Sequence, residues 1–399
     1  MTQEIMKKPR PELRFKGFTD DWAQRQVKDI AHECHGGGTP STQIAQYWEG
    51  NTPWLQSRDL TENVLFSTTS NKYISNQAIE SSATQLVPKD SIAIVTRVGV
   101  GKLVLLPYSY CTSQDFLSLS GLTKDNDFLV YALYIVLQHK KNRVQGTSIK
   151  GITKTELLSS NISVAPSKME QKRIGDFFRT LDNLIVAAER KVELLKRRKK
   201  AYLQRIFNQE LRFKGFTDDW AQRKFGDLYQ KVTEKYDAKH DMNAISVANM
   251  QFRSVESTDC DYLKTYNVMR VGDIAFEGNK SRYFSHGRFV ENTIGNGIIS
   301  HVFDVFRPVK QQDLSFWRYL IHNEQVMGPV LARCTSSSIM MNNLIGQDFL
   351  KLSIYVPSDD EQKLIGEFFR TLDNLIVAAE RKTDLLKRKK QAYMQRMFV

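Results

Sequence analysis

Two segments of this chain occur twice. Residues 13–25 (LRFKGFTDDWAQR) recur unchanged at 211–223, an offset of 198. Residues 170–207 recur at 361–398 with 8 differences in 38 positions. A repeat constrains architecture more than a single motif does, because each copy is one structural unit used again. The chain therefore consists of a short repeated segment, an insert and a long repeated segment, followed by the same three parts. We call the two repeated segments of each half its frame.

The inserts between the repeated segments differ. Residues 27–167 contain Gly-Gly-Thr-Pro-Ser and Thr-Arg-Val-Gly segments that residues 224–358 lack. Two nearly identical frames with different inserts predict a pseudo-twofold molecule that performs one kind of task on two targets. The alternative is a recent duplication without functional meaning. The predicted domains are 1–167 and 209–358, and the predicted long helices are 168–208 and 359–399.

The second repeated segment is predicted to form one long helix in each half. Residues 176–209 and 367–399 contain neither glycine nor proline and are rich in good helix formers. Ser167 and Ser358, each preceded by a proline, are candidate N-caps. Apolar residues then recur every three or four positions in both copies, which is the heptad pattern of a coiled coil.

Lysine interrupts this apolar seam at the same position in both copies, Lys199 and Lys390. A single polar residue in a seam can fix helix register, so we expect these lysines to align the two helices. Leu194 and Leu385 lie off the seam. They widen the apolar stripe, which predicts cover by the globular domains or by another subunit. The residues predicted for the coiled coil and for subunit docking are Phe177, Phe178, Leu181, Leu184, Ile185, Leu195, Phe368, Phe369, Leu372, Leu375, Ile376 and Leu386.

Each insert mixes strand-like and helix-like patterns, so the predicted fold class is α+β. Strands are predicted at 91–95, 103–106, 116–119, 262–269, 274–276 and 298–306. Helices are predicted at 128–140 and 314–327.

Motifs of common enzyme classes do not match. The segment Gly99-Val100-Gly101-Lys102 lacks the first glycine and the hydroxyl residue of a phosphate-binding loop. No Asn-Pro-Pro-aromatic motif of an amino-methyltransferase occurs. The ligands of His32-Glu33-Cys34-His35 are crowded, and no distant Cys/His pair completes a tetrahedral zinc site. The sequence therefore predicts neither a metal nor a catalytic site on this chain.

Charge points to a polyanionic partner. The 399 residues carry a formal net charge of +13, which favours nucleic acid first and an acidic protein surface second. The repeated segments 170–207 and 361–399 carry +6 and +4 of that charge, so the helices also lie near polyanion or an acidic subunit. The longest apolar run, 128–137, is too short for a membrane span. Four scattered cysteines predict reduced thiols in a cytoplasmic protein.

The order of motifs resembles that of the specificity subunits of type I restriction–modification systems. The resemblance rests on 37–41 (GGTPS), 53–60 (PWLQSRDL), 96–99 (TRVG), 112–116 (TSQDF) and 151–154 (GITK). A Pro-x3-Glu-Gln-x2-Ile-Gly pattern also opens each long helix at Pro166 and Pro357. The second insert lacks the GGTPS and TRVG segments.

The resemblance implies a non-catalytic DNA reader. Each insert would be a target recognition domain for one half of a split, asymmetric DNA sequence. The two helices would form an antiparallel coiled coil that sets the spacer and docks two modification (methyltransferase) subunits. S-adenosylmethionine, ATP and Mg²⁺ would be bound by the modification and the restriction/translocase subunits.

Polar and basic residues in glycine-containing loops are candidates for contact with bases and phosphates. The predicted DNA contacts are Thr39, Ser41, Gln56, Ser57, Arg58, Arg97, Lys102, Gln114, Asn249, Asn279, Lys280, Arg282, Tyr283 and Arg288. Two alternatives remain, a stand-alone bivalent DNA-binding regulator and a nuclease or methyltransferase with an unrecognised site.

Overall fold

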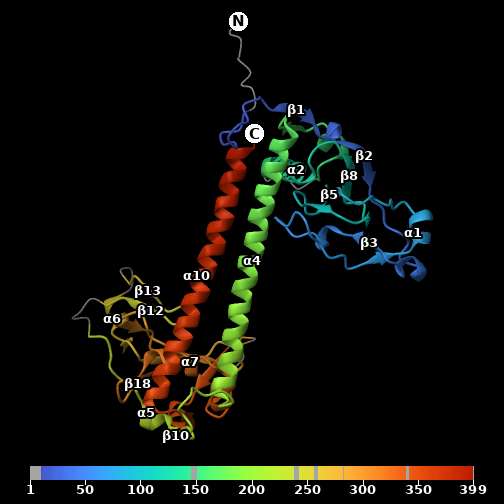
Figure 1. The fold of residues 1–399 in the computed structure, drawn as a ribbon. Helices are drawn as coiled ribbons and strands as arrows, with labels where there is room; N and C mark the ends of the chain where they lie inside the picture. Colours follow the sequence, from blue (N-terminus) through green and yellow to red (C-terminus); the bar gives the residue numbers. More distant parts are fainter. Residues whose placement is uncertain are drawn as a thin grey trace. The chain divides into compact units, whose positions relative to one another are not determined.

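The chain divides into two compact units. The structure is a computed structural model that describes residues 10–144, 151–237, 242–255, 259–281, 283–337 and 341–398. One unit is formed by Met1–Ala188 with Lys382–Val399, and the other by Glu189–Arg381. Each unit combines one insert with segments of both long helices (Figure 1). Both units contain helices and sheets, which confirms the α+β prediction.

Two sheets form the first insert. The larger sheet has the order β2-β8-β5-β6, with bounds Ala31–Gly36, Phe116–Leu122, Ser91–Val95 and Leu103–Leu106. The smaller has the order β4-β3-β7, with bounds Tyr73–Ile74, Thr52–Leu55 and Cys111–Thr112. Strands β3 and β7 are parallel, and the neighbouring strands of the larger sheet are antiparallel. Strands β5 and β6 have the predicted bounds.

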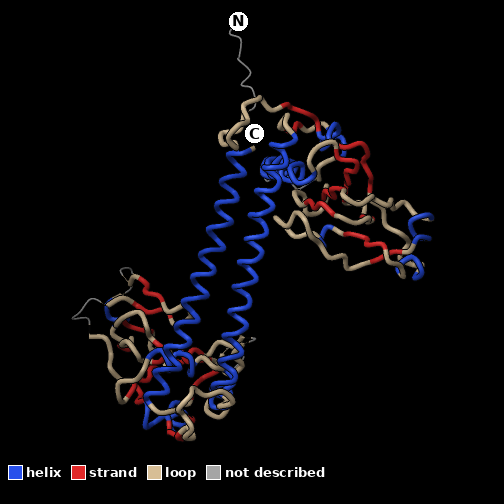
Figure 2. The backbone as a smooth tube through the Cα atoms, viewed as in Figure 1, coloured by secondary structure: helices blue, strands red, loops and turns tan. Residues whose placement is uncertain are grey.

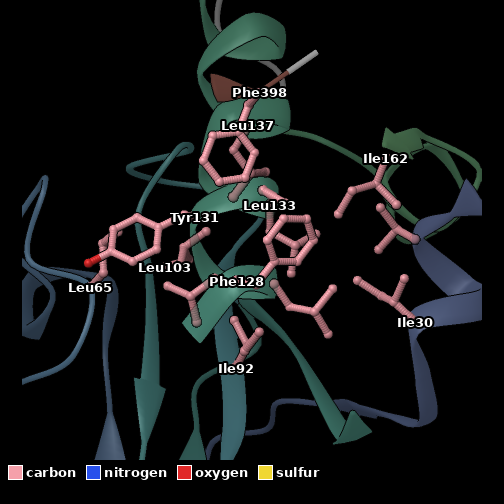
Figure 3. Packing of buried hydrophobic residues seen from close by; sticks show 14 of the residues in the cluster. Ile30, Leu65, Ile92, Leu103, Phe128, Tyr131, Leu133, Leu137, Ile162 and Phe398 are labelled. Atoms are coloured by element: carbon pink, nitrogen blue, oxygen red, sulfur yellow. The ribbon is translucent and has the colours of Figure 1, made fainter. Parts of the chain in front are cut away.

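Helix α2 (Asn126–Val144) covers one face of the larger sheet. Ile92 and Leu103 point to that face and join the core formed by Phe128, Leu133 and Phe398 (Figure 3). The alternate residues of the same strands pack in a second core on the opposite face. This two-sided burial explains why β5 and β6 are continuous apolar runs in the sequence. The remaining short helices are η1 (Val27–Ile30), η2 (Ala45–Trp48), η3 (Ser57–Asp59), α1 (Asn76–Glu80) and α3 (Lys154–Leu158).

The second insert repeats this strand plan without repeating its motifs. One of its two four-stranded sheets has the order β11-β18-β15-β16, with bounds Tyr229–Lys231, Val305–Pro308, Ile274–Glu277 and Arg288–Glu291. Its other sheet has the order β13-β12-β17-β14, with bounds Gln251–Arg253, Ala244–Ser246, Gly297–Ile299 and Asn267–Met269. This second sheet contains one parallel pair, β12 with β17, as the smaller sheet of the first unit does with β3 and β7.

Three element predictions in the second insert were wrong. The strand predicted at 298–306 is two strands, β17 and β18. The helix predicted at 314–327 is α7 (Leu314–Ile321) and α8 (Glu324–Leu331), because Asn323 caps a new helix by accepting from the Gln325 amide. The predicted strand 262–269 begins as helix α6 (Cys260–Leu263), which Asp259 caps, and only its end is β14. The other short elements are α5 (Phe225–Leu228), β19 (Thr335–Ser337), β20 (Asn342–Leu344) and α9 (Gly346–Lys351).

The repeated segments build the same local structure in each unit. Strand β1 (Ala23–Gln26) pairs with β9 (Asn161–Val164), and β10 (Ala221–Lys224) pairs with β21 (Ser353–Val356) in the same register. Arg14 forms a two-pronged ion pair with buried Glu170, and Arg212 does the same with Glu361. These contacts anchor the first repeated segment to the start of each long helix.

The long helices are α4 (Lys168–Phe207) and α10 (Asp359–Met397), drawn as long blue coils in Figure 2. Ser167 and Ser358 cap them by accepting from the amides of Glu170 and Glu361 at 3.4 Å, as predicted. Within each unit their segments pack antiparallel. In the first unit Phe178 contacts Phe398 and Asp182 pairs with Lys390. In the second, Lys199 pairs with Asp373 and Tyr202 contacts Phe368.

The N-terminal segment packs against the end of α10. The Leu13 amide donates to the Arg396 carbonyl at 2.8 Å, and Arg396 forms an ion pair with Glu12. The second unit contains the equivalent contact between the equivalent residues, in which the Leu211 amide donates to the Arg205 carbonyl at 3.1 Å. The first repeated segment therefore lies at the end of a long helix in both units. In the second unit it follows that helix in the sequence, and in the first unit it packs against the end of α10 without a chain connection.

Candidate nucleic-acid interface

Four segments that are distant in sequence meet at one cleft in the first unit. The cleft has a volume of about 760 Å³ and an open mouth. It is lined by Gly36, by Thr96, Arg97, Val98 and Gly99 after β5, by Gln114, Phe116 and Leu117 at the start of β8, and by Gly151, Ile152, Thr153 and Lys154 before α3. Three of the motif segments that carry the family resemblance therefore contribute to the same surface.

Backbone contacts hold this cleft together. The Ile152 amide donates to the Thr96 carbonyl at 2.7 Å, and the Thr96 amide donates to the Asp115 carbonyl at 2.7 Å. A Cβ atom on Gly151 would lie 2.3 Å from the Thr96 carbonyl oxygen. Only glycine permits that approach, so Gly151 is needed for the crossing of the two segments.

The glycine-rich segment at 36–41 packs against the same region. A Cβ atom on Gly37 would lie 1.8 Å from the Ser113 carbonyl oxygen, and the Gly38 carbonyl accepts from the buried Trp54 indole at 2.9 Å. The exposed Thr39 hydroxyl donates to Gln114 at 3.0 Å, which brings two predicted DNA contacts together. The third predicted residue here, Ser41, is also exposed.

Lys102 joins the loop after β5 to the segment that contains Gln56, Ser57 and Arg58. Its ammonium donates to the carbonyls of Ser57 at 3.2 Å and Leu60 at 2.8 Å. The Gln56 side-chain oxygen is buried, and Arg58 is exposed to solvent. Lys102 thus supports the loop from within, while Arg97 and Arg58 have exposed side chains.

In the second unit the corresponding loop connects β15 to β16. Asn279 bonds Glu277 at 3.3 Å, and Lys280 donates to the Ser337 hydroxyl at 2.7 Å. Arg288 bonds the Glu277 carboxylate at 2.6 Å and the Ala248 carbonyl at 3.0 Å, so its guanidinium is engaged within the unit. Tyr283 is 62% exposed.

Two further predicted contacts of the second unit complete the set. Asn249 lies in the turn between β12 and β13, where its amide bonds Gln251 at 3.1 Å. Arg282 lies outside the described residues.

Sequence reasoning missed Thr153 and Lys154, which line the same cleft as Arg97. Their segment, Gly-Ile-Thr-Lys, carried part of the family resemblance. The crossing of Ile152 with Thr96 brings that segment to the loop after β5. The signal that could have found them is Gly151, because a glycine in a loop permits another backbone segment to approach closely.

The largest pKa shifts of acidic and imidazole groups lie in the core of the second unit rather than in these loops. Burial raises the pKa of Glu291 to about 8. Burial, with repulsion from Arg288 and Arg318, lowers the pKa of His322 to about 4. Among the described residues, Glu291 Oε2 and His322 Nε2 have no hydrogen-bond partner. Both side chains are therefore neutral near pH 7.

The described residues contain no cluster of three or more His, Cys, Asp or Glu side chains that could hold a metal ion. Of the His32–His35 segment, His35 bonds the Ser120 hydroxyl at 2.7 Å. No described helix has the length and apolar character needed to cross a bilayer.

The predicted docking residues separate into covered and exposed groups. Phe178, Leu181, Ile185, Phe369 and Ile376 are buried. Phe177 is covered by Phe15 and Tyr393, and Phe368 by Phe213 and Tyr202, so the first repeated segment and the other long helix supply the cover together.

Leu184 and Leu375 are each 49% exposed, and Leu194 and Leu385 are 47% and 52% exposed. Leu195, Leu372 and Leu386 are half-buried. Of the off-seam apolar residues, the leucines therefore keep an accessible surface.

The geometry defines a modular two-domain protein in which a repeated frame carries two different sets of polar loops. The family model described as the type I restriction modification DNA specificity domain matches residues 19–196 and 217–388. These two matches cover most of the chain. The chain belongs to this family.

Named relatives agree with this assignment. The MjaIX specificity subunit of a type I restriction enzyme from Methanocaldococcus jannaschii is 27% identical over 203 residues, 48% of this chain and 46% of the relative. The chain thus matches about half the length of that relative. The MjaVIII specificity subunit from the same organism is 22% identical over 421 residues, 96% of this chain and 93% of the relative.

A solved structure shares the fold. The S subunit of a type I restriction-modification system from M. genitalium superimposes with a TM-score of 0.58 and 14% identity. The superposition covers 98% of this chain and 99% of that chain.

Proposed function

We propose that this chain is the DNA-reading specificity subunit of a type I restriction–modification complex. Each insert reads one half of a split, asymmetric DNA sequence. The observation that carries this proposal is the cleft where Arg97, Gln114 and Lys154 meet from separate segments. A cation beside amide and hydroxyl groups suits phosphate and base-edge contact.

The repeated frame and the different loops have separate roles in this proposal. The frame contacts are the same in both units, from the paired strands to the Arg14–Glu170 and Arg212–Glu361 ion pairs. The loops at the ends of β5 and β15 differ completely in sequence. A common frame with different loops supports one mode of DNA approach with two different base preferences.

The long helices set the number of unread base pairs between the half-sites and dock two modification subunits. The exposed leucines Leu184, Leu194, Leu375 and Leu385 support a docking role, because they occupy the same positions in both copies of the repeated helix. S-adenosylmethionine is bound by the modification subunits, and ATP and Mg²⁺ by the restriction/translocase subunits. The complex acts on DNA in the cytoplasm.

The chain itself is non-catalytic. The polar groups at the cleft are suited to binding, and the neutral buried Glu291 and His322 lie in the core of the other unit.

Incubation of the purified chain with DNA, Mg²⁺ and S-adenosylmethionine tests this proposal. Neither cleavage nor methylation is expected, whereas addition of the modification subunits produces methylated adenines at a bipartite sequence. Methylation or cleavage by the chain alone would favour an enzyme with its own site. Sequence-specific binding and regulation without any effect of modification subunits would favour a stand-alone regulator.

A further inference from the structure

The two inserts present equivalent hairpins. Strands β5 and β6 occupy the same places in their sheet as β15 and β16 do in theirs. The residue that follows the first strand is crossed by a later segment in both units. The Ile152 amide donates to the Thr96 carbonyl at 2.7 Å, and the Asn342 amide donates to the Gly278 carbonyl at 2.8 Å. The loops that begin at Thr96 and Gly278 are therefore structural counterparts.

In the first unit the loop presents an apolar side chain at its tip. Val98 is 74% exposed, the highest value among the large hydrophobic residues that the structure describes. Single exposed apolar residues are common on protein surfaces, so exposure alone indicates nothing. Val98 differs because it lines the cleft between the exposed cation Arg97 and Gly99.

The base of this loop is fixed, so Val98 is presented at a defined place. Lys102 donates to the carbonyls of Ser57 and Leu60, and Gln138 donates to the Gly101 carbonyl at 3.1 Å. The Val100 amide donates to the Arg97 carbonyl at 3.1 Å, which closes a tight turn around Val98. A residue held in this way loses little conformational freedom when it binds.

The counterpart loop in the second unit also presents a largely exposed apolar surface. Tyr283 is 62% exposed, and its backbone amide donates to the Ser281 hydroxyl at 3.2 Å. Lys280 of the same loop supplies a cation, as Arg97 does in the first unit. Both loops thus combine a cation with an exposed side chain that has apolar surface, the isopropyl group of Val98 in one and the ring of Tyr283 in the other.

We infer that Val98 reads base identity by contact with the 5-methyl group of a thymine in the major groove. This inference rests on the proposed function. Arg97 would direct the loop to the phosphate backbone, and the isopropyl group at the tip would then meet base edges. Most groups on those edges are hydrogen-bond donors or acceptors, and the distinct apolar feature is the thymine methyl. Val98 therefore favours a T at one position of the half-site read by the first unit.

Replacement of single thymines by uracil tests this directly, because uracil lacks only the methyl group. The two half-sites are first identified from the adenines methylated in vivo. Duplexes with one thymine replaced at a time are then titrated with the full chain bound to its modification subunits. For one position in one half-site, we expect the wild type to bind the uracil duplex about fourfold more weakly, as for the loss of one buried methyl group.

Val98→Ala should bind the thymine and uracil duplexes equally at that position. Val98→Thr, which keeps the shape and one methyl group, should retain part of the discrimination. Val186→Ala is the matched control, because Val186 is 41% exposed on α4 and outside the cleft. The Val186→Ala variant should prefer the thymine duplex over the uracil duplex to the same extent as the wild type. Melting curves of the variants check that the first unit stays folded.

Two results overturn the inference. One is a wild type that tolerates every thymine-to-uracil replacement, and the other is a Val98→Ala variant that keeps the discrimination of the wild type. In both cases sequence-specific binding remains, so the proposed function stands. Absence of any sequence preference in the wild-type complex would instead overturn the proposed function itself.

Discussion

Lys199 of α4 donates to Asp373 of α10 at 2.6 Å, and its ammonium lies 5.0 Å from the centre of the Tyr319 ring. Asp373 also accepts from the Tyr319 hydroxyl at 2.6 Å. One carboxylate thus ties both helices of the second unit to its insert. In the first unit Lys390, Asp182 and Tyr131 form the same arrangement.

Asp373→Ala should destabilise the second unit by about 1–3 kcal/mol, because the Tyr319 hydroxyl and the half-buried Lys199 ammonium lose their acceptor. Urea unfolding, followed by a probe in each unit, measures this. The adjacent exposed residue Asn374 provides the control, and Asn374→Ala should have little effect. Equal stability of Asp373→Ala and the wild type would show that the pairing does not hold the helices.

Arg14→Ala should destabilise the first unit by roughly 3 kcal/mol, because the Glu170 side chain is only 1% exposed and would lose its charged partner. Arg212→Ala should have a similar effect on the second unit through Glu361. Arg14→Lys keeps the charge without the two-pronged geometry and should recover part of the stability. Thermal unfolding of the three variants compares them. A large difference between Arg14→Ala and Arg212→Ala would contradict equivalent frames.

Glu291 makes the second unit less stable as pH rises. Its pKa is about 8 when folded and about 4.5 when unfolded. Between these values the unfolded chain releases a proton that the folded chain keeps, so stability falls up to about pH 8 and then levels. Glu291→Gln should remove this dependence, with a gain on the order of 3 kcal/mol at pH 8. Urea unfolding from pH 5 to 8.5 tests the sign. Parallel pH profiles for the variant and the wild type would refute it.

Leu184→Glu combined with Leu375→Glu should weaken binding of the modification subunits at least tenfold while leaving the fold intact. Both leucines are half-exposed, so the change removes apolar contact area without opening a core. Calorimetric titration measures the affinity. The pair Val186→Glu and Val377→Glu, on nearly the opposite face of the same helices, is a control for added charge. Unchanged assembly of the leucine variant would place the docking surface elsewhere.

The sequence predicted the helices and the frame well, because their signals are local and occur twice. The caps at Ser167 and Ser358 and the seam lysines lie in the repeated segments or directly before them. Strands β5 and β6 were found at their bounds, because burial on both faces makes them continuous apolar runs.

The common plan of the two inserts could not be read from sequence. It is defined by strand pairing and by one backbone crossing, Ile152 with Thr96 and Asn342 with Gly278, which different residues satisfy in each unit. The surroundings of the predicted site residues depend on the same packing. Lys102 and Arg288 have internal partners that depend on this packing, and Lys154 reaches the cleft only through it.

Exchange of the second insert tests the central claim most directly. Residues 224–358 are replaced by the insert of a relative that modifies a different sequence, and methylated adenines are mapped across a genome that carries the chimera and its modification subunits. The account predicts that one half of the bipartite target changes, while the other half and the spacer length stay the same. A change in both halves, or in neither, would contradict it.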